Sequence, residues 1–205
     1  MLYYKFLISI NKCLINEKCT SLYIKDFSPK LIPLNGKTII NIYLNEYINE
    51  KIIEILLVNI PCLLINSSNI IQCQSQLSNS SRKGQISIRF SNSIYILSKE
   101  NIEYCQSSII SINPNIVYEF GGQILHINGQ NLFIGNEQKI FIDNYQCIQI
   151  KQTLLNTLSC RLPSMISKIY NITFKIDHQV INIEQKLKVT PNPIVQDIDP
   201  TLSFA

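Results

Sequence analysis

The sequence repeats itself once, and this repeat constrains the fold more than any other feature. The two copies share a proline, a glycine, an asparagine and two cysteines in the same order. These matched pairs are Pro29 and Pro114, Gly36 and Gly121, Asn59 and Asn144, Cys62 and Cys147, and Cys73 and Cys160. A repeat of roughly 85 residues is long enough for each copy to bury a core of its own. The sequence therefore predicts two copies of one small domain.

A third copy is expected to begin near the end of the chain. Asp199-Pro200 stands in the same relation to the second copy as Asn113-Pro114 does to the first. We therefore expect the chain to be a piece of a longer protein.

Each copy is predicted to be all-β. Isoleucine supplies 40 of the 205 residues, and its branched Cβ favours strands. Ile86–Phe90 and Ile172–Ile176 alternate apolar and polar residues, which is the period of a half-buried strand. The turn signals between such runs are Asn35-Gly36, Arg82-Lys83-Gly84, Phe120-Gly121-Gly122 and Asn128-Gly129. Short strands at this density indicate an antiparallel sandwich. Helical spacing of apolar residues leaves one alternative, a short helical turn at Tyr47–Lys51.

Composition excludes several classes of protein. Hydrophobic residues make up 46% and charged residues 16% of the chain, which excludes a disordered polypeptide. The net charge is only +4 and the longest basic run is Arg82-Lys83, so no nucleic-acid footprint is expected. The most apolar stretch, Ile52–Ile65, is interrupted by polar residues and falls short of the roughly 18 residues of a spanning helix. The apolar part of Met1–Ile10 is shorter than the apolar core of a secretory signal peptide. A weak signal peptide remains the alternative to a start within a longer chain.

The polar residues do not form a recognisable catalytic or metal site. We expect His126 on the solvent face of a strand and His178 in a hairpin turn, neither with a nucleophile and an orienting partner. Asp177, Asp197 and Asp199 lack the regular spacing of a calcium loop and are expected to be solvated. No C-x-x-C motif occurs, and neither histidine has zinc-ligand spacing from a cysteine pair. The sequence thus predicts no enzyme activity, cofactor or metal.

The cysteines indicate one disulfide in each copy. The same repeat positions hold Cys62 and Cys73 in the first copy and Cys147 and Cys160 in the second. A bridge between such partners contributes about 3 kcal/mol by closing a short loop, and it persists only in an oxidising compartment. The alternative is that these cysteines are reduced and buried in a cytosolic chain. Three cysteines remain without an evident partner: Cys13, Cys19 and Cys105.

Three sequons for N-glycosylation occur, at Asn66, Asn79 and Asn171. With 22 asparagines in the chain, that number arises by chance, so it does not indicate secretion. In a secreted chain, Asn66 and Asn79 fall in expected turns and are plausible acceptors. Asn171 begins an expected strand and is the weaker acceptor.

The second copy resembles the opening of an IPT/TIG domain. That family begins with a proline, then Gly-Gly-Thr, alternating apolar residues and a G-x-N-L motif. Residues 121–132 follow this order, with Gln123 in place of the threonine. The cysteine pair and Thr190–Pro193 also match, and Asp197–Phe204 resembles the start of a following IPT domain in plexins and the hepatocyte growth factor receptor. The first copy is degenerate, because it keeps Gly36 but lacks the second glycine motif.

The resemblance implies an all-β chain of two tandem immunoglobulin-like IPT/TIG sandwiches. Residues 1–19 would end a PSI module, 20–105 and 106–191 would form the two IPT domains, and 192–205 would begin a third. Tight turns would need the glycines Gly36, Gly121, Gly122 and Gly129.

The same resemblance implies a stalk segment in the ectodomain of a plexin-like semaphorin receptor. Its partners would be neighbouring sema, PSI and further IPT modules, and a semaphorin-type ligand would bind only parts outside this chain. The segment would lie on the extracellular face of the plasma membrane in a single-pass receptor, with no anchor of its own. Its role would be spacing and rigidity, since the prolines of Thr190–Pro193 limit the connector.

Other uses of this domain type stay open. The segment could belong to a relative of the hepatocyte growth factor receptor or another adhesion protein. It could also lie beside the catalytic domain of a carbohydrate-active enzyme. A Rel-type transcription factor, which shares the fold, would need a basic DNA-contacting loop that this sequence lacks.

Overall fold

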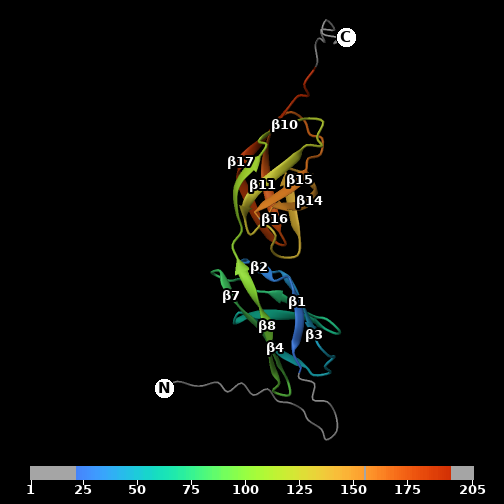
Figure 1. The fold of residues 1–205 in the computed structure, drawn as a ribbon, viewed down its shortest axis with the longest axis vertical. Coiled ribbons are helices and arrows are strands. Elements are labelled where there is room, and N and C mark those ends of the chain that lie inside the picture. The colour runs from blue at the N-terminus through green and yellow to red at the C-terminus, as the bar shows by residue number, and fades with distance from the viewer. Residues whose placement is uncertain (1–21, 155, 195–205) are drawn as a thin grey trace, which may run out of the picture. The chain divides into compact units, whose positions relative to one another are not determined.

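The computed structural model describes residues 22–154 and 156–194, and every regular element in these ranges is a β-strand (Figure 1). The all-β prediction is therefore confirmed. The chain forms two compact units. Two predicted pieces, the PSI tail at 1–19 and nearly all of the third domain at 192–205, lie outside the described residues.

From residue 22 onward, where the structure describes it, the first unit contains eight strands in two sheets. The strands are β1 (Ile24–Ser28), β2 (Leu31–Pro33), β3 (Ile39–Leu44), β4 (Ile52–Leu57), β5 (Ile60–Ser67), β6 (Ile71–Ser75), β7 (Arg82–Phe90) and β8 (Tyr95–Cys105). They follow the order β1-β3-β6-β5-β4-β7-β8-β2. Strand β5 joins the two sheets, because Ile60 and Pro61 pair with β4 and the residues from Cys62 onward pair with β6.

Apolar side chains from both sheets fill the space between them. The largest fully buried ones in this unit are Phe27, Ile32, Ile40, Ile42, Leu57, Ile86, Ile88, Ile102 and Tyr104. Alternation along each strand explains this core, since successive side chains point to opposite faces of a sheet. In β3, for example, Ile40 and Ile42 are completely buried while Asn41 between them is partly exposed.

The described residues of the second unit form nine strands, in separate sheets of five and four strands. The strands are β9 (Ser108–Asn113), β10 (Ile116–Tyr118), β11 (Ile124–Gln130), β12 (Gln138–Ile142), β13 (Tyr145–Gln146), β14 (Ile148–Leu154), β15 (Thr157–Arg161), β16 (Ile169–Ile176) and β17 (Gln179–Thr190). One sheet has the order β10-β17-β16-β12-β13 and the other β14-β15-β11-β9. Strand β16 alternates exposed and buried residues along its length.

The strand pairing repeats together with the sequence. In each unit the first strand pairs antiparallel with the third, as β1 with β3 and β9 with β11. The short second strand pairs parallel with the last one, as β2 with β8 and β10 with β17. Pro29 and Pro114, the matched prolines, both follow a cis peptide bond. The two sequence copies thus build the same strand arrangement.

Two local turn predictions were wrong, and the helical alternative did not form. No helical turn forms at Tyr47–Lys51, where the chain runs through irregular structure into β4. Arg82-Lys83 is not a turn but opens β7, because both residues pair with the end of β8. Asn128-Gly129 is not a turn either but lies within β11, at a shift in its register with β9.

Candidate functional site

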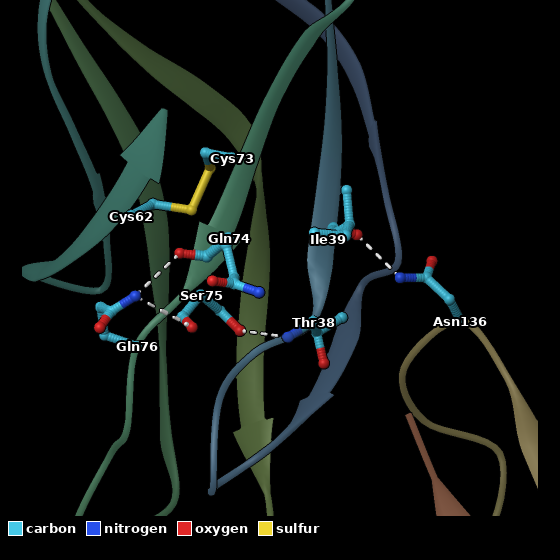
Figure 2. Close-up of a disulfide and its surroundings, with 8 residues drawn as sticks. All are labelled: Thr38, Ile39, Cys62, Cys73, Gln74, Ser75, Gln76 and Asn136. Atoms are coloured by element: carbon cyan, nitrogen blue, oxygen red, sulfur yellow. Dashed lines mark hydrogen bonds between the residues drawn. A yellow bond between two sulfur atoms is a disulfide. The ribbon is translucent and has the colours of Figure 1, made fainter. Parts of the chain in front are cut away.

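One disulfide lies in each unit. Cys62 on β5 is bonded to Cys73 on the neighbouring strand β6 (Figure 2), with 5.5 Å between the Cα atoms. Cys147, which lies between β13 and β14, is bonded to Cys160 on β15, with a Cα separation of 5.7 Å. All four cysteines are buried. Each bridge therefore fastens a hairpin from inside the core.

Two buried hydroxyl residues lie close to the first disulfide: Ser75, two positions after Cys73 on β6, and Thr38, directly before β3. Thr38 and Ser75 are both completely buried. The Thr38 amide donates to Ser75 Oγ at 3.1 Å (Figure 2). The Ser75 amide donates in return to the Thr38 carbonyl oxygen at 2.9 Å. Because buried polar groups are costly when unpaired, these reciprocal bonds fix the start of β3 against the end of β6.

The first compact unit also includes two short segments from later in the chain, Phe133–Glu137 and Ile176–Gln179. The carboxylate of Asp177 organises them. Its Oδ2 accepts from Thr38 Oγ1 at 2.6 Å, and its Oδ1 accepts from the amides of Asn136 and Glu137 at 2.9 Å each. Asn136 Nδ2 in turn donates to the carbonyl oxygen of Ile39 at 2.8 Å (Figure 2).

The prediction that Asp177 is an ordinary solvated carboxylate is thus wrong. Three donors engage it, and such charge-assisted bonds are stronger than neutral ones. Sequence reasoning missed this cluster because its partners are far apart in the chain. Thr38 is 139 positions from Asp177 and Asn136 is 41 positions away. The arrangement is a carboxylate that accepts from one hydroxyl and two backbone amides, which fixes these segments against the start of β3.

The predicted turn glycines fall into two groups. Gly36, Gly121 and Gly122 have φ values of 69°, 71° and 78°, a left-handed conformation that glycine adopts without strain. Gly129 differs, because it lies in a strand and is not among the residues with positive φ. A Cβ on Gly129 would lie 3.2 Å from the Cα of Ile109, so close strand packing explains this glycine.

The histidines do not form a catalytic group. His126 lies on β11, where its Nδ1 is 2.7 Å from Ser159 Oγ on the facing strand β15. Ser159 is only 5% exposed, so a substrate could not reach its hydroxyl. His178 lies in the turn between β16 and β17, as the sequence predicts.

Two buried groups at the end of β8 are not reactive either. Cys105 is a free, buried thiol, and burial raises its pKa to about 11. Because the thiolate is the reactive form, such a thiol is inert near neutral pH. Burial also raises the pKa of Tyr104 to about 12, and its hydroxyl has no hydrogen-bond partner among residues 22–154 and 156–194.

The three sequons differ in their surroundings. Asn66 is exposed near the end of β5, and its Nδ2 donates to the hydroxyl of Ser68, the third residue of the same sequon, at 3.1 Å. Asn79 is exposed in a bend after β6. Asn171 is held instead: its Nδ2 donates to Asp143 at 3.1 Å and its side-chain oxygen accepts from Lys186.

No metal site or membrane helix occurs in the part of the chain that the structure describes. Across residues 22–154 and 156–194, no three His, Cys, Asp or Glu side chains gather in a way that could hold an ion. The same ranges contain no helix of the length and apolarity needed to cross a bilayer.

The comparisons with known proteins agree with this geometry. Residues 107–189 match the family model of the IPT/TIG domain. Plexin-2 of Caenorhabditis elegans is 26% identical over 193 residues, which cover 91% of this chain and 11% of the relative, and Plexin-2 of Caenorhabditis briggsae gives the same values. The chain therefore spans about a tenth of the length of these curated relatives.

A solved structure extends the likeness to the fold. The extracellular region of plexin A4, domains 1 to 10, superposes with a TM-score of 0.75 at 18% sequence identity, over 90% of this chain and 17% of that one. At this identity the match shows a shared all-β fold. Residues 107–189 are therefore similar to the IPT/TIG domain, and the chain as a whole resembles the extracellular region of the plexins.

Proposed function

We propose that this chain is an extracellular stalk segment of a plexin-like cell-surface receptor that responds to a semaphorin-type ligand in its full-length form. The similarity to Plexin-2 over 91% of the chain carries this proposal, because it covers both units and not only the IPT/TIG match at 107–189. In this role the segment spaces neighbouring sema, PSI and IPT modules. It binds no semaphorin by itself and catalyses no reaction.

The division into domains belongs to the same proposal. Residues 20–105 form a first, degenerate IPT-like domain, 106–191 a second, and the flanking segments belong to adjacent modules. The repeated strand pairing supports this, since β1–β8 and β9–β17 use the same partners in the same directions.

The two disulfides support the extracellular placement. Both close short loops within a buried core, and glutathione and thioredoxin keep thiols reduced in the cytosol. Their recurrence at matched positions is what a secreted domain of this size uses to supplement a small core.

The test uses the full-length protein on intact cells. A membrane-impermeant labelling reagent should modify exposed lysines of this segment, and peptide mapping without reduction should recover the linked pairs Cys62–Cys73 and Cys147–Cys160. Labelling only after permeabilisation, or free thiols at these positions, would overturn the extracellular assignment.

A second measurement tests whether ligand binding resides in other modules of the ectodomain and not in this segment. A semaphorin-type ligand should be retained by the purified complete ectodomain and should pass over the isolated chain. Retention by the isolated chain would show that the segment contacts ligand directly and is more than a spacer.

A further inference from the structure

The hairpin of β5 and β6 lies in a long uncharged stretch. From Ile55 to Ser81 the sequence contains no Asp, Glu, Lys, Arg or His, although charged residues make up 16% of the whole chain. Natural proteins usually place charged side chains, lysine above all, along strands that are not covered by a neighbour. This hairpin lacks that protection.

One side of β5 has no strand partner over most of its length. Only Ile60 and Pro61 pair with β4, whereas Cys62–Ser67 pair with β6 on the other side. Within the described residues, the backbone from Leu63 to Ser67 therefore presents an open edge. Unpaired amides and carbonyls in a row are a template for pairing with another chain.

The open edge is also apolar. Leu63, Leu64 and Ile65 are consecutive residues with exposed fractions of 55%, 44% and 56%. A single exposed apolar residue needs no explanation, but three in a row on an open edge favour self-association. The register shift between Leu64 and Asn66 bends the strand there and is a partial defence.

A sequon sits on this edge. Asn66 directly follows the three apolar residues, and its side chain is exposed. The Ser68 amide donates to Asn66 Oδ1 and Asn66 Nδ2 donates to Ser68 Oγ, both at 3.1 Å. The nitrogen that would carry the sugar and the hydroxyl that defines the sequon therefore meet at the surface.

The other two sequons provide a comparison. Asn171 is the weakest acceptor, because Asp143 and Lys186 hold both ends of its amide and β17 and β12 flank its strand. Asn79 is exposed and also lies in the uncharged stretch, but it follows β6 and is not on the open edge of β5.

We propose that an N-linked oligosaccharide on Asn66 covers the open edge of β5 and prevents it from pairing with a second copy of the chain. In this role a bulky, hydrated and uncharged glycan replaces the charged side chains that are missing between Ile55 and Ser81. The inference rests on the proposed extracellular placement, because the modification takes place in the secretory pathway.

The transfer is a substitution without oxidation or reduction. The donor is an oligosaccharide on a polyprenyl diphosphate. A bond forms between Asn66 Nδ2 and the anomeric carbon of the first sugar, while the bond from that carbon to the diphosphate oxygen breaks. The polyprenyl diphosphate leaves with the electron pair, and the proton lost from Nδ2 is transferred to a general base at the transferase.

The experiment uses the full chain made in a secretory host. Peptide mass spectrometry after enzymatic deglycosylation measures occupancy at each sequon, and sedimentation over a wide range of protein concentration measures self-association. Asn66→Gln should raise the association constant at least about tenfold, which corresponds to roughly 1.4 kcal/mol. Asn79→Gln is the matched control and should leave it near that of the unchanged protein.

A second variant identifies the associating surface. Ile65→Lys, added to Asn66→Gln, places a charge on the edge and should restore the monomer. Recovery of the Cys62–Cys73 peptide in each variant shows that the hairpin still folds.

Three results would overturn the proposal. They are an unoccupied Asn66 in the secreted protein, an Asn66→Gln variant as monomeric as Asn79→Gln, and association that Ile65→Lys does not reverse. Failure of the extracellular assignment would look different, because protein from its natural source would then lack glycan at Asn79 as well as at Asn66. The secretory-host experiment would still report whether a glycan covers the edge.

Discussion

Gly121 and Gly122 lie in the same turn, and replacing each by alanine separates the cost of backbone strain from the cost of steric overlap. Both have positive φ, 71° and 78°, so alanine at either position must adopt a left-handed conformation. Their surroundings differ. A Cβ on Gly121 would lie 2.5 Å from the amide nitrogen of Ser164 and equally close to the carbonyl oxygen of Pro163, whereas a Cβ on Gly122 would meet no atom within 4 Å.

The expected costs follow from these distances. A left-handed conformation costs an L-residue about 1–2 kcal/mol, and the lower entropy of the unfolded alanine chain returns about 0.4–1 kcal/mol. Gly122→Ala should therefore lower the free energy of unfolding by about 1 kcal/mol. Gly121→Ala adds an overlap with backbone atoms, which cannot rotate away, and overpacking of this kind costs about 1–3 kcal/mol more. Its total should be about 2–4 kcal/mol.

The measurement is urea unfolding of the full chain, followed by circular dichroism. Hydrogen exchange of peptides from β11 and β15 assigns the loss to the second unit, because Gly122 N donates to Leu162 O just beyond β15. Equal losses in the two variants, or a larger loss for Gly122→Ala, would refute the argument from close approach.

Three further perturbations test the core and its charges. Replacing Cys62 and Cys73 together by alanine should cost about 3 kcal/mol in urea unfolding, and an unchanged midpoint would contradict a formed bridge. Tyr104→Phe removes a buried hydroxyl that has no partner among the described residues, so it should raise the free energy of unfolding by about 1 kcal/mol. Burial raises the pKa of Tyr104 to about 12 from 10.0. The stability of the unchanged protein should therefore be steady below pH 10 and fall between pH 10 and 12, and the variant should lack this fall. The backbone amide of Asn171 donates to Asp143 and holds the pKa of that carboxyl below 3.8. The stability that this bond contributes should be present above pH 3.8 and decline as the pH falls through the lowered pKa. Asp143→Asn should flatten this decline in acid, and identical pH profiles of the two proteins would count against the bond.

The sequence by itself determined the fold class and the repeat. Strands follow from β-branched residues in alternation, and two matched copies of such a pattern must bury two similar cores. The Gly-Gly turn before β11 was predictable for the same local reason, since only glycine accepts the left-handed φ of both residues without strain. These features depend on neighbours a few positions apart, which a sequence displays directly.

Predictions that failed depended on partners elsewhere in the chain. Arg82 reads locally as a charged turn, but the end of β8 offers a strand to pair with and overrides the turn signal. Gly129 reads as a turn glycine, but its role is to let β9 approach β11.

Asp177 shows most clearly what only the tertiary structure decided. The sequence around Asp177 is that of an ordinary hairpin turn, and nothing in it indicates a bond to the buried hydroxyl of Thr38, 139 positions away. The open edge of β5 could not be predicted from the sequence either, because the apolar run would be the same whether or not another strand paired with it. Which backbone groups find a partner is set when distant strands meet, and that pairing is a property of the folded chain alone.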